Sequence, residues 1–106
     1  MDETLGGTRI TYFGHATFRI VTPGDEQILI DPFLTDNPMT PEELKQVGEL
    51  DTMLITHGHF DHFADAIPLA QETGATAVAN FEIFSYLQNK GVENGQPIQK
   101  GGTVQV

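Results

Sequence analysis

The sequence predicts an α/β or α+β fold with a mixed β-sheet, and two observations support this prediction. Three segments of strand character come first, at residues 9–13, 16–22 and 27–31, with only short turns between them. From residue 52 onward, strand and helix patterns alternate. Short turns are typical of a β-meander, whereas alternation with helices is typical of a parallel sheet. The length of 106 residues suits one compact domain.

The first part of the chain is rich in β-branched and aromatic residues, which favour strands. They dominate residues 9–13 (RITYF) and 16–22 (ATFRIVT). The segment PGDE is typical of a turn, and it leads into the apolar residues 27–31 (QILID). We therefore expect a meander of three strands that ends at Asp31.

The middle of the chain contains a proline-rich loop, a short helix and a buried strand. Thr40 is the expected N-cap of the helix, Pro41 its first residue, and Gly48 lies near its end. Residues 52–56 (TMLIT) form a continuous apolar run. Such a run is typical of a strand that is buried on both faces.

The last third alternates between helix and strand. Helical spacing covers about residues 63–73, with Gly74 placed as a C-terminal cap. A short strand follows at 76–79, and Asn80 is the expected N-cap of a second helix at 81–89. The remainder is rich in turn residues and ends in the pattern of a beginning strand.

Composition narrows the range of partners. The chain has 15 acidic and 5 basic residues, for a net charge of -10, so we expect no binding to nucleic acid or anionic membranes. Cysteine is absent, which excludes disulfides and thiolate zinc sites. No apolar stretch is long enough to cross a bilayer, and the first ten residues lack the features of a signal peptide. The expected location is the cytoplasm.

A dense cluster of metal-ligand residues follows the strand at 52–56. It consists of His57, His59, Asp61 and His62. Residues two apart at a strand end face the same way, so His57 and His59 can bind one metal ion, while Asp61 and His62 can reach a second. Imidazole and carboxylate suit Zn²⁺, Mn²⁺ or Fe²⁺. Three of the chain's four histidines fall within six residues, which argues against a chance cluster on a solvated loop.

The pattern H-x-H-x-D-H after an apolar strand resembles the first metal-binding motif of the metallo-β-lactamase superfamily. The segments YFGHAT at 12–17 and ILIDPFL at 28–34 are similar to the start of the UPF0173-type metal-dependent hydrolases. The resemblance extends from about residue 9 to the end of the chain. It implies that residues 1–106 are the N-terminal half of an αββα sandwich, with a mixed sheet and helices on one face.

This resemblance implies a hydrolase with two divalent metal ions in each complete site. His57 and His59 would serve metal site 1, and Asp61 and His62 would serve metal site 2. Zn²⁺ is the first expectation, with Mn²⁺, Fe²⁺ or Ni²⁺ as alternatives. The metal ions would activate water to cleave an ester, lactone, amide or phosphoester in a small-molecule substrate. Asp61 is the candidate catalytic residue, which would steer the nucleophile or carry a proton.

Two residues outside the cluster are implied by the same resemblance. Asp31 would accept a hydrogen bond from a ligand imidazole and so hold its orientation. The alternative is a turn residue at a strand end before proline. His15 would lie near the rim of the pocket, and its alternative is a structural histidine in a tight turn.

Half of the family's site is absent from this sequence. The family's domain has two similar halves over about 200 residues or more, and no histidine follows His62 here. The chain is then a fragment or an engineered half, one member of a homodimer, or a partner for a separate second half. Each case leaves an apolar inner face that needs a partner. The alternatives to a hydrolase are a non-catalytic metal-binding half-domain, an assembly module that dimerises through this face, and an inert half that binds metal adventitiously.

Overall fold

The computed structural model describes residues 2–106 of the chain. It contains seven strands, which are β1 (Asp2–Leu5), β2 (Thr8–Gly14), β3 (Thr17–Val21), β4 (Gln27–Ile30), β5 (Thr52–Leu54), β6 (Thr76–Ala79) and β7 (Gly95–Pro97). The helices are the 3₁₀ helix η1 (Glu42–Leu44), α1 (Phe60–Phe63), α2 (Ala66–Thr73) and α3 (Phe81–Asn89).

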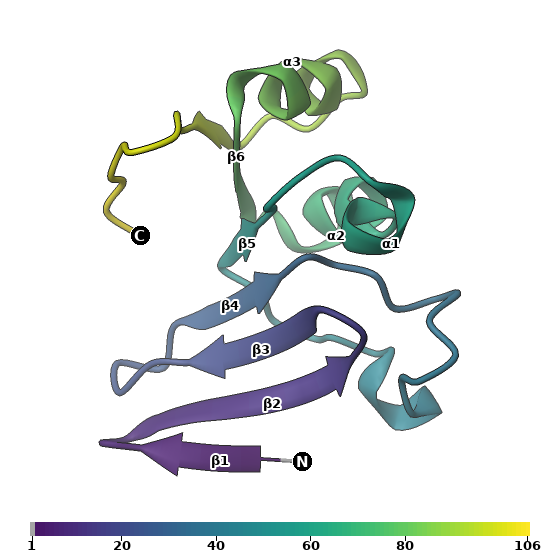
Figure 1. Ribbon diagram of the computed structural model, residues 1–106, viewed down its shortest axis with the longest axis vertical. Coiled ribbons are helices and arrows are strands. Elements are labelled where there is room, and N and C mark those ends of the chain that lie inside the picture. The colour runs from purple at the N-terminus through teal and green to yellow at the C-terminus, as the bar shows by residue number, and fades with distance from the viewer. Residues whose placement is uncertain (1) are drawn as a thin grey trace.

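All seven strands form one mixed sheet in the order of the sequence, β1-β2-β3-β4-β5-β6-β7. Neighbouring strands from β1 to β4 are antiparallel, and those from β4 to β7 are parallel (Figure 1). The change occurs where short turns give way to longer crossovers, as parallel pairing requires. The predicted mixed sheet of an α/β fold is therefore confirmed.

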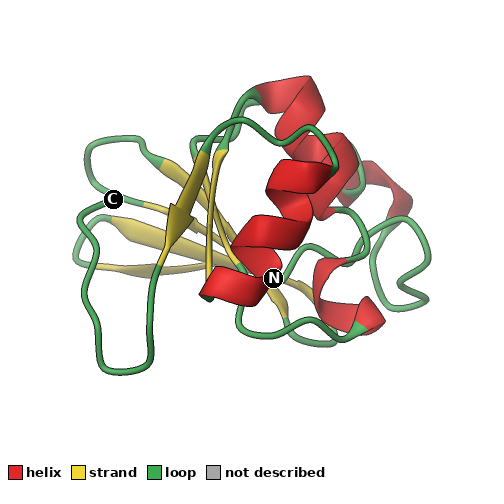
Figure 2. Cartoon of the chain, turned by 90° about the horizontal axis from the view of Figure 1, so that it is seen from above, coloured by secondary structure: helices red, strands yellow, loops and turns green. Residues whose placement is uncertain are grey.

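The helices cover one face of the sheet (Figure 2). Leu29, Met53 and Ala77 lie opposite one another on β4, β5 and β6, and all three belong to the main hydrophobic cluster. Leu69 of α2 and Leu87 of α3 belong to the same cluster. The chain thus has a core between sheet and helices, as a two-layer fold requires.

Helix α3 begins with the predicted side-chain cap. The Asn80 side-chain oxygen accepts a hydrogen bond from the backbone N–H of Ile83 at 2.9 Å. We expect Asn80→Ala to lower the free energy of unfolding by about 1 kcal/mol, because this N–H then loses its partner. Urea denaturation tests the prediction, with exposed Asn89→Ala at the other end of α3 as the control. Equal effects of the two substitutions would contradict it.

The opposite face of the sheet has no covering helix in the part of the chain that the structure describes (Figure 2). Side chains alternate along a strand, so the neighbours of the core residues point to this face. One row of cross-strand partners consists of Tyr12, Phe18, Ile30, Leu54 and Val78. A second row consists of Ile10, Ile20, Ile28, Thr52 and Thr76. We name these two rows the open face.

The C-terminal segment lies against one end of the open face. Val104 and Val106 line a cavity of about 210 Å³ together with Thr52, Thr76 and Val78. The larger part of the open face, on β2, β3 and β4, lies away from this cavity. No helix within residues 2–106 has the length and apolar character needed to cross a membrane.

Three local predictions were wrong. The helix expected from Thr40 to Gly48 is only the 3₁₀ helix η1, whose N-cap position is Pro41. Thr40 is not a cap, because its hydroxyl donates to the backbone oxygen of Phe13 at 2.7 Å. The expected helix at 63–73 is two helices, since α1 ends before Asp65 and α2 begins after it.

The third error concerns the ends of the sheet. The strand expected at the C-terminal end is instead the earlier strand β7, which pairs with β6. Strand β1 was not predicted, although it forms a hairpin with β2 through Gly6 and Gly7. Both glycines have positive φ angles, 56° and 88°, which a two-residue hairpin turn favours.

Candidate metal centre

The candidate site lies at one edge of the sheet, where three strands end. Strand β2 runs in the same direction as β4 and β5, so their carboxyl ends meet at this edge. His15 follows β2, Asp31 follows β4, and the motif from Thr56 to His62 follows β5. The topology thus brings together the three separate segments that carry the residues predicted to form the site.

Asp31 is the residue that holds Thr56 and His62 of the site in place. It is buried, with 3% of its surface exposed, and it has a left-handed backbone with a φ of 50°. Its Oδ1 accepts a hydrogen bond from the backbone N–H of Thr56 at 2.7 Å. Its Oδ2 accepts one from the Thr56 hydroxyl at 2.7 Å and lies 2.8 Å from Nδ1 of His62. Three contacts therefore hold one carboxylate in a fixed position.

Thr56 extends this network to His57. Its hydroxyl oxygen lies 2.8 Å from Nδ1 of His57. Because the hydroxyl proton is donated to Asp31, the oxygen can only accept here, so Nδ1 of His57 carries the proton. Nδ1 of His62 likewise donates to Asp31. In their neutral forms both rings then present an unprotonated Nε2, which is the form that binds a metal ion.

Thr56 was not among the site residues predicted from the sequence. Its position directly before the motif, at the end of the strand, was the available indication. We expect Thr56→Val, which keeps the shape of the side chain, to weaken metal binding roughly tenfold because the His57 ring loses its orienting partner. Competition with a chelating dye measures this, and exposed Thr103→Val is the control. Unchanged affinity in Thr56→Val would contradict the role.

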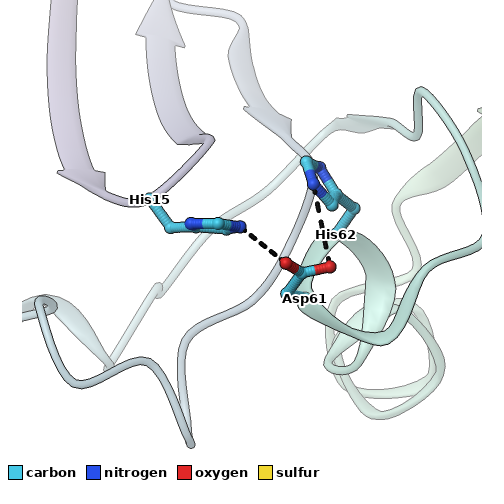
Figure 3. Close-up of side chains that lie close together, drawn as sticks. All are labelled: His15, Asp61 and His62. Carbon is cyan, nitrogen blue, oxygen red and sulfur yellow. Dashed lines mark hydrogen bonds and ion pairs between the residues drawn. The ribbon is translucent and has the colours of Figure 1, made fainter.

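Asp61 faces two histidines. Its Oδ2 lies 2.8 Å from Nε2 of His15, and its Oδ1 lies 3.8 Å from Nε2 of His62 (Figure 3). Partial desolvation acts to raise the pKa of Asp61, but the hydrogen bond from His15 and the positive charge that His62 carries when it is protonated outweigh it. The pKa of Asp61 therefore lies below its ordinary value. Asp61 is thus ionised at neutral pH and can accept hydrogen bonds or bind a cation.

The rings of His15 and His57 both lie close to that of His62. Its ring centroid lies 4.0 Å from that of His57 and 5.3 Å from that of His15. His59 packs edge-on against His57 at 4.7 Å. Within the described residues, two sets of three side chains have possible ligand atoms within 4.8 Å of one another: His15 with Asp61 and His62, and Asp31 with His57 and His62. His59 belongs to neither set.

The two sets differ in chemistry. Both oxygens of Asp31 already accept hydrogen bonds, and the residue is buried, so Asp31 is better suited to orient ligands than to bind a metal ion. Asp61 and His15 each have 44% of the side chain exposed. Neutral imidazoles and an ionised carboxylate are good ligands for divalent transition metals. The residues present therefore fit a metal ion.

Asp65 fixes the loop that follows Asp31. Its Oδ2 accepts hydrogen bonds from the backbone N–H of Leu34 at 2.6 Å and of Thr35 at 3.2 Å, and its Oδ1 accepts one from the Thr35 hydroxyl at 2.6 Å. The backbone N–H of Asp65 donates to the oxygen of Pro32 at 3.0 Å. The start of α2 is thereby joined to the segment that carries Asp31. Asp65 was not among the residues predicted from the sequence, because it belongs to no recognisable motif.

Comparison with known proteins agrees with this geometry. Residues 9–104 match the beta-lactamase superfamily domain, which covers most of the chain. The chain belongs to the beta-lactamase superfamily. The predicted resemblance is confirmed at the level of the family.

Superfamily relatives with high identity are named UPF0173 metal-dependent hydrolases. The relative from Rubrobacter xylanophilus is 74% identical over 106 residues, which are 100% of this chain and 44% of that protein. The relative from Koribacter versatilis is 51% identical over 102 residues, 96% of this chain and 44% of that protein. The chain therefore spans less than half the length of these relatives.

A solved structure of a metallo hydrolase shares the fold. Igni18, described as a novel metallo hydrolase from the hyperthermophilic archaeon Ignicoccus hospitalis, superposes with a TM-score of 0.81 at 34% identity. The match covers 93% of this chain and 42% of Igni18. Both comparisons place this chain in a family of metal-dependent hydrolases.

Proposed function

We propose that this chain contributes half of the metal ligands of a hydrolytic site with two divalent metal ions. His57 and His59 would serve one ion, and Asp61 and His62 the other. The observation that carries this proposal is the network centred on Asp31, which assigns the proton to Nδ1 of two histidines and leaves each Nε2 available. A cluster without a role in metal binding has no need of this shared tautomer.

The chain's own residues would do three things in the reaction. Asp31 and Thr56 hold two ligand rings in fixed orientations. Asp61 offers an ionised carboxylate that can orient a nucleophile or accept its proton. The partial exposure of Asp61 also leaves room for substrate. Divalent metal ions, when bound, supply the Lewis acidity that makes water nucleophilic near neutral pH. We propose an ester, lactone, amide or phosphoester of a small molecule as substrate. Zn²⁺ is the first candidate metal, with Mn²⁺, Fe²⁺ or Ni²⁺ as alternatives.

The open face supports the proposal that this chain is one half of a larger domain. Its two rows of mostly apolar side chains are wide enough to pack against a second sheet. The curated relatives are more than twice as long as this chain. We propose that the part of those relatives that this chain does not match covers the open face and completes the site. A second copy of the chain is the alternative occupant.

A non-catalytic assembly module is the second candidate function. The same open face favours it, because two copies could bury these rows against each other without any chemistry. Coordination distinguishes the two functions, since a structural metal site is closed by protein ligands and a hydrolytic site keeps a position open.

Reconstitution tests the proposed function. The chain would be co-expressed with the unmatched part of the Rubrobacter xylanophilus relative and assayed on chromogenic esters, lactones, amides and phosphoesters. We expect hydrolysis of at least one class, its loss after chelation, and its return after Zn²⁺ or Mn²⁺ is added. Asp61→Asn should abolish it, whereas exposed Asp36→Asn should not. A folded, metal-loaded pair without activity on any class would overturn the hydrolase proposal and favour the assembly module.

A further inference from the structure

The turn that carries His15 is held in one conformation. Gly14 has a φ of 113°, and a side chain at this position would meet Met39, since a Cβ would lie 2.7 Å from that of Met39. His15 itself has a left-handed backbone with a φ of 56°, which costs a non-glycine residue about 1 kcal/mol. The Tyr12 hydroxyl donates to the backbone oxygen of His15 at 2.8 Å. Strain maintained by surrounding contacts is common at functional sites.

The side chain of His15 points from this turn to the cluster on α1 (Figure 3). Its Nε2 is 2.8 Å from Oδ2 of Asp61, and Oδ1 of Asp61 is 3.8 Å from Nε2 of His62. Ligand atoms around one tetrahedral zinc ion lie about 3.3 Å apart, because each is about 2.0–2.1 Å from the metal. The two observed distances lie on either side of this value. The two contacts use different oxygens of Asp61, and possible ligand atoms of the three residues all lie within 4.8 Å of one another. Side-chain rotations that close these separations to about 3.3 Å would place the three groups around one ion.

The three side chains also have suitable chemistry and access. Nδ1 of His62 is already bonded to Asp31, so Nε2 is its only free ligand atom. Half-exposed His15 can carry its proton on Nδ1, so that a cation replaces the proton between Nε2 and Asp61. Two imidazoles and one carboxylate form a ligand set that binds Zn²⁺ or Fe²⁺ and leaves further positions open.

We propose that His15, Asp61 and His62 form a three-ligand site for one divalent metal ion that is complete within this chain. The proposal rests on the metal binding proposed above for Asp61 and His62, and it adds His15 as a ligand from the β2–β3 turn. The ion would bind without His57, His59 or the part of the relatives that this chain lacks. It would also tie the antiparallel part of the sheet to α1, two parts of the chain that are 46 residues apart in sequence.

Titration of the 106-residue chain with Co²⁺ tests this site, with equilibrium dialysis for affinity and the visible spectrum for ligand type. We expect one Co²⁺ per chain in the wild type and in the His57→Ala/His59→Ala variant. His15→Asn retains a residue that tolerates the left-handed turn but lacks the imidazole, so its affinity should fall about tenfold or more with a changed spectrum. Asp61→Asn, which removes the second ligand, should likewise lower the affinity for Co²⁺, and Asp36→Asn is its matched control. Far-UV circular dichroism verifies that each variant is folded.

His15→Gln separates a ligand from a hydrogen-bond donor, because its amide can still donate to Asp61 but is a poor metal ligand. Loss of binding in this variant supports the site. Wild-type binding in His15→Gln would overturn the proposed site and leave His15 as a positioning residue. Loss of the ion in the His57→Ala/His59→Ala variant would also overturn it, because the ion would then bind elsewhere. A chain that binds no Co²⁺ also overturns it, yet the reconstituted pair could still hydrolyse substrate, so this failure is distinct from failure of the proposed function.

Discussion

Asp31→Asn is expected to weaken metal binding by about 10–100-fold, the effect typical of a lost partner of a metal-ligating histidine. Asparagine has the same shape and tolerates the left-handed backbone at this position, so the fold should persist. Its amide, however, offers one acceptor oxygen where the carboxylate offers two. The N–H of Thr56, the hydroxyl of Thr56 and Nδ1 of His62 then compete for that oxygen.

Chelator competition with Zn²⁺ or Co²⁺ measures this effect. Asp25→Asn is a matched control, because Asp25 also has a left-handed backbone, with a φ of 65°, but is exposed on a turn. The control should retain wild-type affinity. If Asp31→Asn binds as tightly as the control, Asp31 has only the structural role of a turn residue before proline, and the network does not orient the metal ligands.

Asp65→Ala is expected to lower the free energy of unfolding by about 3 kcal/mol, since hydrogen bonds to a charged group each contribute about 1.5–3 kcal/mol and the donors lose their partner. The side chain accepts from Leu34 and Thr35, and it joins α2 to the loop after β4. Because Asp65 is 8% exposed, water can replace it only in part.

Urea denaturation followed by circular dichroism measures the change. Asp36→Ala in the same loop is the control, and as an exposed residue it should alter stability by less than about 0.5 kcal/mol. Metal affinity should also fall in Asp65→Ala, because the loop positions Asp31. A loss of stability equal to that of the control would show that this carboxylate does not fix the loop.

Much of the fold could be predicted because local patterns and tertiary structure agree. The strands at 9–13 and 27–31 have β-branched, apolar residues between turn residues, and the helix at 81–89 has an asparagine cap that forms the expected hydrogen bond. The H-x-H-x-D-H pattern depends only on neighbouring positions. Its location after a buried strand was therefore visible without tertiary information.

Other features depend on contacts between distant residues. Thr40 has the sequence context of a helix cap, but its hydroxyl is used by Phe13 of β2, 27 residues away in sequence. Asp65 interrupts a regular helical pattern because its carboxylate bonds to a loop 30 and 31 residues away. Neither partner can be identified from spacing along the chain.

In the candidate site, too, some features could be predicted from the sequence and others depend on tertiary contacts. Its metal-ligand types were evident from the sequence, whereas the connection from His57 through Thr56 to Asp31 required the sheet to place β4 beside β5. The contact of His15 with Asp61 likewise depends on the direction of β2 in the sheet. Strand β1 is different, because the adjacent glycines Gly6 and Gly7 are a hairpin signal that sequence patterns alone could have revealed.

The metal content of the reconstituted pair, measured with its native mass, tests the two-metal hydrolytic site most directly. The pair is this chain with the unmatched part of the Rubrobacter xylanophilus relative, in wild-type form and with His57→Ala/His59→Ala. We predict two metal ions per pair in the wild type, one in the variant, and loss of hydrolysis with the missing ion. A pair of the correct mass that binds no metal, or that keeps the same metal content in the variant, would contradict the assignment of the histidine cluster as half of that site.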